Sequence, residues 1–76
     1  MREIKTGKKY RHFKGMEVIV EIIAKDTETL EPLVVYKHIG KEEYWIRPYD
    51  MFNSEVDKNK YPDVKQKYRF EEIKED

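Results

Sequence analysis

Hydrophobic and polar residues alternate along most of this chain with the period of two that is typical of β-strands. The alternation runs through residues 8–13, 17–25, 33–39, 44–48 and 68–73. No stretch shows the wider period of a long amphipathic helix. The pattern therefore predicts five short strands separated by turns and loops.

The connections are predicted from turn and helix signals. Residues 26–32 are rich in turn-forming side chains and end in a proline, which predicts a loop. Pro48 can begin a single helical turn that ends at Phe52. Residues 54–67 are polar and without periodicity, so we expect a long exposed loop. The alternative is a helix over Ser54–Gln66 in an α+β fold, which Pro62 and the missing apolar stripe disfavour.

The fold class follows from these elements. Ile19 and Ile23 interrupt the polar face of the strand at 17–25, which predicts a strand that bends and is buried on both sides for part of its length. We expect an all-β domain over residues 1–76. Its architecture is a small SH3-type barrel or a strongly bent five-stranded antiparallel sheet, with one short helical turn.

The third and fourth predicted strands form a hairpin with an unusual surface. We expect Ile39 to lie opposite Tyr44, which places His38 opposite Trp45 and Tyr36 opposite Arg47. One face of the hairpin then carries Tyr36, His38, Trp45 and Arg47. The other face carries Leu33, Val35, Ile39 and Ile46, and we expect this second face to be the core.

Length and composition narrow the function. A chain of 76 residues has room for one small core, so a deep enzymatic cavity is not expected. The absence of cysteine excludes disulfides, thiolate zinc sites and a cysteine nucleophile, and it suits a reducing cytoplasm. No apolar stretch is long enough for a membrane span or a signal peptide. We therefore expect a cytoplasmic protein with no membrane partner.

The net charge of zero conceals an uneven distribution. Residues 2–14 carry a net charge of +5, residues 15–56 carry −5, and residues 57–76 are balanced. Such a separation can steer an anionic partner toward one end of the molecule, or the segments can neutralise one another within the fold.

Several blocks of the sequence, taken together, resemble one protein family. They are Gly7–Gly15, Ala24, Thr27–Thr29, Val34–Tyr36, Trp45–Pro48, Met51–Phe52 and Arg69–Phe70. In this order they resemble the small bacterial family catalogued as domain of unknown function 1653. The resemblance implies an SH3-type barrel in a bacterial protein and implies no activity.

The chain departs from the family pattern at a few positions. Val18 and Asp26 stand where the family tends to have Tyr and His, and the segment after Ile39 lacks a Tyr. With Asp26 in place of a family histidine, we do not expect histidine-based chemistry in that loop. The set formed by His12, Glu28, Trp45 and Arg47 remains complete.

Each candidate residue has a functional and a structural interpretation. Trp45 can form a stacking platform with Tyr36 and His38, although the burial tendency of indoles favours core packing. Arg47, held extended by the following proline, can bind a phosphate or carboxylate, or it can pair with Tyr36 or Glu28.

The sequence offers little support for catalysis or metal binding. His12 can exchange a proton with Glu28 or Asp26, but no nucleophile motif and no glycine-rich phosphate loop accompanies them. Two histidines without ligand spacing predict no metal site, and no cofactor is expected. We therefore expect a protein that is not an enzyme.

The sequence-based hypothesis is a small binding or adaptor module that contacts RNA or a protein segment through an aromatic and basic surface. Its candidate residues are His12, Lys14, Glu28, Tyr36, His38, Trp45 and Arg47. The alternative is a structural or regulatory accessory protein that forms a homodimer through the hairpin face. The sequence leaves open whether the protein is a monomer or a homodimer.

Overall fold

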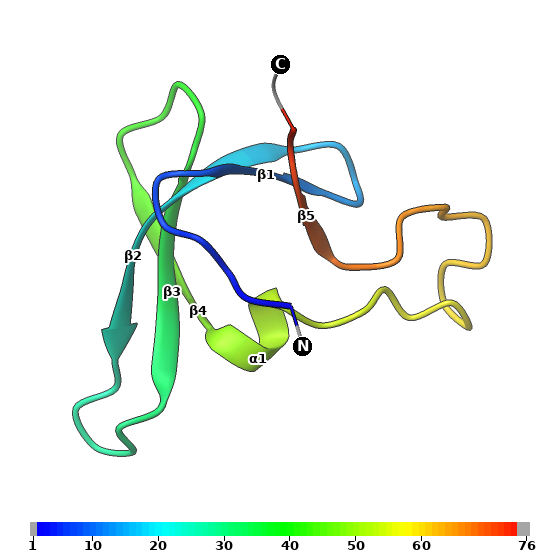
Figure 1. The fold of residues 1–76 in the computed structure, drawn as a ribbon. Helices are drawn as coiled ribbons and strands as arrows, with labels where there is room; N and C mark the ends of the chain where they lie inside the picture. Colours follow the sequence, from blue (N-terminus) through cyan, green and yellow to red (C-terminus); the bar gives the residue numbers. More distant parts are fainter. Residues whose placement is uncertain (1, 75–76) are drawn as a thin grey trace.

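The computed structural model describes residues 2–74, which form one bent antiparallel sheet and one short helix (Figure 1). The strands are β1 (Lys9–His12), β2 (Glu17–Lys25), β3 (Pro32–His38), β4 (Tyr44–Pro48) and β5 (Phe70–Glu72), and the helix is α1 (Tyr49–Phe52). The strand order is β4-β3-β2-β1-β5, so β4 and β5 are edges and the sheet does not close into a barrel. The predicted all-β class, five strands and helical turn are confirmed, and of the two architectures the bent sheet is the one observed.

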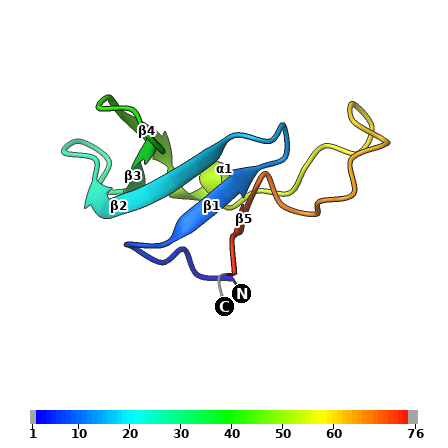
Figure 2. The same cartoon turned by 90° about the horizontal axis from the view of Figure 1, so that it is seen from above.

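The sheet bends along β2. The first residues of this strand pair with β1, whereas its pairing with β3 extends from Val18 to Lys25. The register with β3 shifts between Val20 and Ile22, and a bulge of this kind bends and twists the strand that contains it. Figure 2 shows β1 and β5 on one side of β2, with β3 and β4 on the other. Ile19 is half-buried, whereas Ile23 is exposed and the bulge leaves Ile22 exposed too, so the predicted burial of this strand on both sides is only partly correct.

The core lies on one face of the sheet, which we call the inner face. α1 covers this face through Phe52, whose ring stacks on that of Phe70 with 4.1 Å between centroids. Tyr10 and Tyr36 pack against Phe52 at 5.6 and 5.5 Å between centroids. The buried cluster consists of Ile4, Tyr10, Val18, Val20, Val34, Tyr36, Phe52 and Phe70.

The β3–β4 hairpin has a different register from the predicted one. Tyr36 lies opposite Trp45, whereas the sequence placed it opposite Arg47. The reason is an early turn: the backbone N–H of Lys41 donates to the carbonyl of His38, and Gly40 adopts a φ of 85°. Ile39 donates its N–H to the carbonyl of Glu17 in β2, and it has no partner in β4.

The two faces of this hairpin are also reversed with respect to the core. The shift of two positions keeps the side chains of Tyr36, His38, Trp45 and Arg47 on one face, as predicted. That face is the inner one, because Val34 and Tyr36 are buried. The predicted core face, which carries Leu33, Val35, Ile39 and Ile46, is the outer face, and Ile46 is 60% exposed.

The segment between α1 and β5 has no helix, so the alternative helix over Ser54–Gln66 is wrong. A single bridge between Glu55 and Tyr68 closes its base. Val56 donates its N–H to the carbonyl of Lys67, and the Lys58 ammonium donates to the carbonyls of Val64 and Gln66. The predicted loop is therefore held together by hydrogen bonds, and it projects from the edge of the sheet (Figure 1).

Candidate functional site

Three of the candidate residues, His12, Lys14 and Arg47, line one cavity of about 310 Å³. Arg69 and the segment that contains Lys60 complete its wall. These residues come from the end of β1, the turn after it, β4, the loop beyond α1 and the residue before β5. We call this hollow the basic cavity, because four cationic residues line it and Asp57 is the one carboxylate among the described residues that does so.

His12 lies at the centre of the charges of the basic cavity. Its ring packs edge-on against the buried Phe70 ring, at 4.9 Å between centroids. Partial burial lowers the pKa of His12 below its ordinary value of 6.5, and the positive charges of Arg47, Arg69, Lys14 and His38 lower it further. The imidazole is therefore favoured in its neutral form.

A hydrogen bond selects the tautomer of this neutral imidazole. The backbone N–H of Lys14 donates to Nδ1 of His12 across 3.1 Å. Because Nδ1 accepts, the ring proton of the neutral form resides on Nε2. His12 thus offers one hydrogen-bond donor without needing an additional proton.

Neither guanidinium group of the basic cavity forms an ion pair with a carboxylate of residues 2–74. Arg47 places Cζ 5.7 Å from the centroid of the Phe70 ring, at the margin of the core. Within residues 2–74, the ion pairs involve Lys5, Arg11 and Lys37, and none involves Arg47 or Arg69. Asp57 uses Oδ1 to accept the N–H groups of Asn59 and Lys60, which ties its carboxylate into the turn of the loop. The basic cavity therefore keeps an excess of positive charge.

Aromatic rings accompany these cations. The ring of Phe13 stacks on His12 at 4.5 Å and packs against Tyr61 at 4.9 Å between centroids. The Lys14 ammonium lies 5.5 Å from the Tyr61 centroid, and the Lys60 ammonium lies 5.6 Å from the same point. The basic cavity thus combines cationic groups with flat apolar surfaces.

The remaining aromatic candidates lie beside the basic cavity on the inner face. The His38 ring is 6.3 Å from the Trp45 ring and perpendicular to it, and it is 6.4 Å from the Tyr36 ring. Tyr36 is buried and packs in the core, so little of its ring is open to a ligand. Trp45 is 50% exposed, which leaves part of the indole face available for stacking.

Glu28 lies apart from the other candidates. It belongs to the loop that follows β2, whereas His12 and Lys14 lie by the turn that precedes β2. β2 lies between these two positions along the chain, and Glu28 does not line the basic cavity. Within residues 2–74, no hydrogen bond or ion pair joins His12 to Glu28 or Asp26, and none joins Arg47 to Glu28.

The basic segment at residues 2–14 does not form one continuous surface. Arg2 is part of the fold, since Nη1 donates to the carbonyl of Phe70 at 2.7 Å and Cζ lies 3.9 Å from the Tyr68 ring centroid. Lys5 pairs with Glu72 at 3.5 Å, and Arg11 pairs with Glu17 at 3.0 Å. Of this segment, Lys14 is the cation that reaches the basic cavity.

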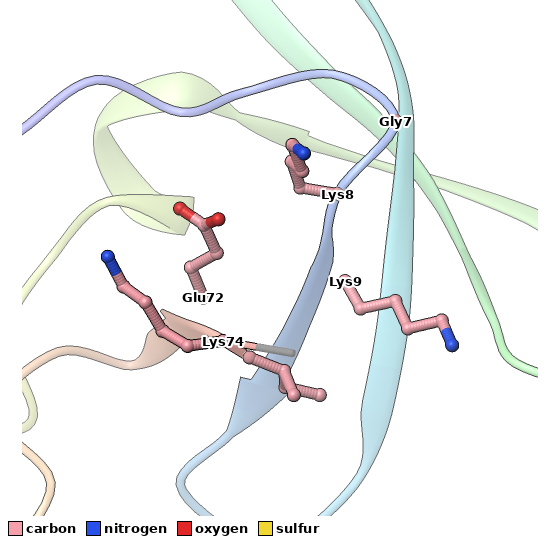
Figure 3. A pocket seen from close by; sticks show the side chains of 6 residues that line it. Gly7, Lys8, Lys9, Glu72 and Lys74 are labelled. Carbon is pink, nitrogen blue, oxygen red and sulfur yellow. The ribbon is translucent and has the colours of Figure 1, made fainter. Parts of the chain in front are cut away.

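A second hollow, of about 280 Å³, lies between residues 7–9 and 72–74 (Figure 3). Figure 3 shows the Lys9 side chain directed away from those of Glu72 and Lys74, so the charged ends diverge. Glu72 is already paired with Lys5. This hollow does not gather its charges on one point, and we do not regard it as the candidate site.

The sequence did not identify half of the basic cavity. Arg69 is not among the candidate residues of the sequence analysis, and Lys60 and Tyr61 belong to a loop without a periodic pattern. The sequence signal that was available is the run from His12 to Lys14, in which an imidazole, a phenyl ring and an ammonium are adjacent.

Neither a cluster of metal ligands nor a membrane-spanning helix is found in the part of the chain that the structure describes. No group of three or more His, Cys, Asp or Glu side chains in residues 2–74 is arranged to hold a metal ion. No helix in the same range has the length and apolar character needed to cross a bilayer.

Comparison with protein families decides the family of the chain. Residues 8–72 match the family described as a protein of unknown function, DUF1653. The chain belongs to the DUF1653 family. Comparisons with curated proteins and with solved structures give no match.

The DUF1653 match includes all five strands and every residue of the basic cavity named above. The basic cavity is therefore part of the DUF1653 domain of this chain and not of an added segment. Because the family has no described function, membership assigns the cavity no ligand.

Val18 and Asp26, where the sequence analysis expects departures from the family pattern, have structural roles in this chain. Val18 is fully buried in the core. Asp26 accepts the N–H groups of Glu28 and Thr29 at 2.8 and 3.1 Å, and these hydrogen bonds lower the pKa of its carboxyl. Asp26 therefore shapes the β2–β3 loop.

Proposed function

We propose that this domain is a non-catalytic binding module for single-stranded RNA, with the basic cavity as the contact for the RNA backbone. The observation that supports the proposal is that Arg47 and Arg69 line the same cavity as His12, with no ion-pair partner for either guanidinium within residues 2–74. Like charges held close together destabilise a fold, and a bound anion removes that cost.

Aromatic groups next to the basic cavity favour a single strand over a duplex. Unstacked bases can lie on aromatic rings, whereas the bases of a duplex are already stacked. The pair formed by Phe13 and Tyr61 lines the cavity, and Trp45 is half exposed nearby on the inner face.

The proposal is tested by titrating fluorescently labelled, short single-stranded RNA and following its anisotropy at low and at moderate salt. We expect Arg69→Gln to weaken binding and to reduce the dependence of log K on log salt by about 0.7, the contribution of one contact to a single-strand phosphate. Trp45→Ala should cost about 1–3 kcal/mol of binding free energy if a base stacks on the indole.

Arg11→Gln is the matched control. Arg11 is exposed and pairs with Glu17, outside the basic cavity, so this variant should bind like the wild type. Circular dichroism establishes that each variant is folded. Absence of binding by the wild type at low salt, or equal losses in Arg69→Gln and Arg11→Gln, overturns the proposal.

A second candidate function is homodimerisation through the outer face of the sheet. Ile22, Val35 and Ile46 form a row across β2, β3 and β4, because Val35 lies opposite both isoleucines. Ile22 and Ile46 are 55% and 60% exposed, and contiguous exposed apolar surface is typical of interaction sites. Light scattering after size exclusion should give a dimer that Ile46→Lys converts to a monomer, and a monomeric wild type rejects this candidate.

A further inference from the structure

The cations of the basic cavity gather around one hollow. Lys14, Arg47, Lys60 and Arg69 come from four separate segments and line the same hollow. A protein that follows a nucleic acid backbone places its cations along a groove, one contact after another. A convergent set is suited to a single, more highly charged group.

We propose that the basic cavity binds the terminal phosphate monoester of an RNA strand. This inference rests on the proposed function and specifies which part of the RNA the cavity receives. A monoester carries a charge of about −1.5 to −2 near neutral pH and three acceptor oxygens, whereas an internal diester carries a single charge. The excess of cations over Asp57 matches the monoester better than the diester.

The donors of the cavity fit such a group. Arginine guanidinium groups can each form two parallel hydrogen bonds to phosphate oxygens. Neutral His12 adds the N–H of Nε2, since Nδ1 is occupied by the backbone N–H of Lys14. The Asp57 carboxylate repels an anion, but its Oδ1 is directed into the hydrogen bonds with Asn59 and Lys60.

The size of the cavity leaves room for more than the phosphate group. A volume of about 310 Å³ lies at the lower end of the range for small-molecule sites and exceeds what a phosphate group needs. The rings of Phe13 and Tyr61 line the same hollow and offer flat surfaces to the terminal nucleoside. Phosphate recognition and stacking of the end residue are therefore compatible in one site.

The test compares RNA strands of one sequence that carry a 5′-phosphate, a 3′-phosphate or hydroxyl groups at both ends. We expect one of the phosphorylated strands to bind roughly tenfold more tightly than the hydroxyl strand, the gain of one strong charge-assisted contact. Arg69→Gln and Lys60→Gln should each reduce this preference, whereas Arg11→Gln should retain it. Lys60 is exposed, so its substitution does not endanger the fold.

The outcomes separate this inference from the proposed function. Equal affinity for all three strands overturns the terminal-phosphate inference and leaves RNA binding in place. Absence of binding to any strand overturns both. A nucleoside monophosphate that binds as tightly as the phosphorylated strand shows that the ligand is a free nucleotide, and this result also overturns the assignment to an RNA end.

Discussion

The rings of Phe52 and Phe70 stack with 4.1 Å between their centroids and an angle of 4° between their planes. This contact joins α1 to the edge strand β5, which are separated along the chain by the loop that supplies Lys60 to the basic cavity. Phe70 also contacts His12 and lies beneath Arg47. The core and the candidate site therefore share one side chain.

The first prediction concerns this stack. Phe52→Ala removes a fully buried ring and should lower the free energy of unfolding by about 3–5 kcal/mol, enough to unfold much of a small domain. Its neighbour Met51 is 48% exposed, so Met51→Ala should change stability by less than about 1 kcal/mol. Urea denaturation measures both variants, and similar losses would contradict the stacked arrangement.

A second prediction distinguishes the two faces of the β3–β4 hairpin. Val34→Ala, on the buried inner face, should cost about 2 kcal/mol, whereas Ile46→Ala, on the exposed outer face, should cost less than about 1 kcal/mol. Thermal unfolding monitored by circular dichroism provides the comparison. A larger loss for Ile46→Ala would restore the face assignment that the sequence suggested.

The hairpin shows why sequence periodicity located the strands but not the core. Leu33, Val34, Val35 and Tyr36 are all apolar or aromatic, so alternation alone does not distinguish the two faces of β3. Contacts that are distant along the chain decide the matter, because Phe52 and Phe70 pack on Tyr36. The turn at Gly40 sets the register, and the sequence fits a later turn equally well.

The candidate site, like the hairpin, was predicted only in part from the sequence. His12, Lys14 and Arg47 are in the basic cavity as part of the same surface. Glu28 is not, because its loop follows β2, whereas His12 and Lys14 lie by the turn that precedes β2. Arg69 and Lys60 join the cavity through the fold of the segment between α1 and β5, whose ties are backbone and lysine hydrogen bonds that leave no periodic signal.

A third prediction follows from the lowered pKa of His12. The fold favours neutral His12, so the unfolded chain binds more protons once the pH falls below 6.5, and stability should decrease in that range. Stability measured from about pH 7.5 to about pH 5.5 should fall less steeply in His12→Gln than in the wild type. His38→Gln is the control for the other histidine. Parallel curves for His12→Gln and the wild type would show that His12 does not titrate as proposed.

A fourth prediction concerns the β2–β3 loop. Leu30 is 68% exposed and has a φ of 64°, a conformation that costs an L-residue with a side chain roughly 1–2 kcal/mol. Leu30→Gly should therefore raise the free energy of unfolding by about 0.5–1 kcal/mol, once the greater entropy of glycine in the unfolded chain is included. Leu30→Ala also removes the exposed side chain but retains the strain, so it should not stabilise. A stabilising Leu30→Ala would point to the apolar side chain instead of the backbone.

The central claim is that the basic cavity is where the ligand binds, and amide chemical shifts measured during titration with 5′- and 3′-phosphorylated single-stranded RNA test it most directly. The Lys14 amide is a direct reporter, since it donates to His12. We predict shifts at Lys14 and Arg69, with little change at Val35 and Ile46 on the outer face. Shifts confined to the outer face, or no shifts with either strand at low salt, would contradict this account.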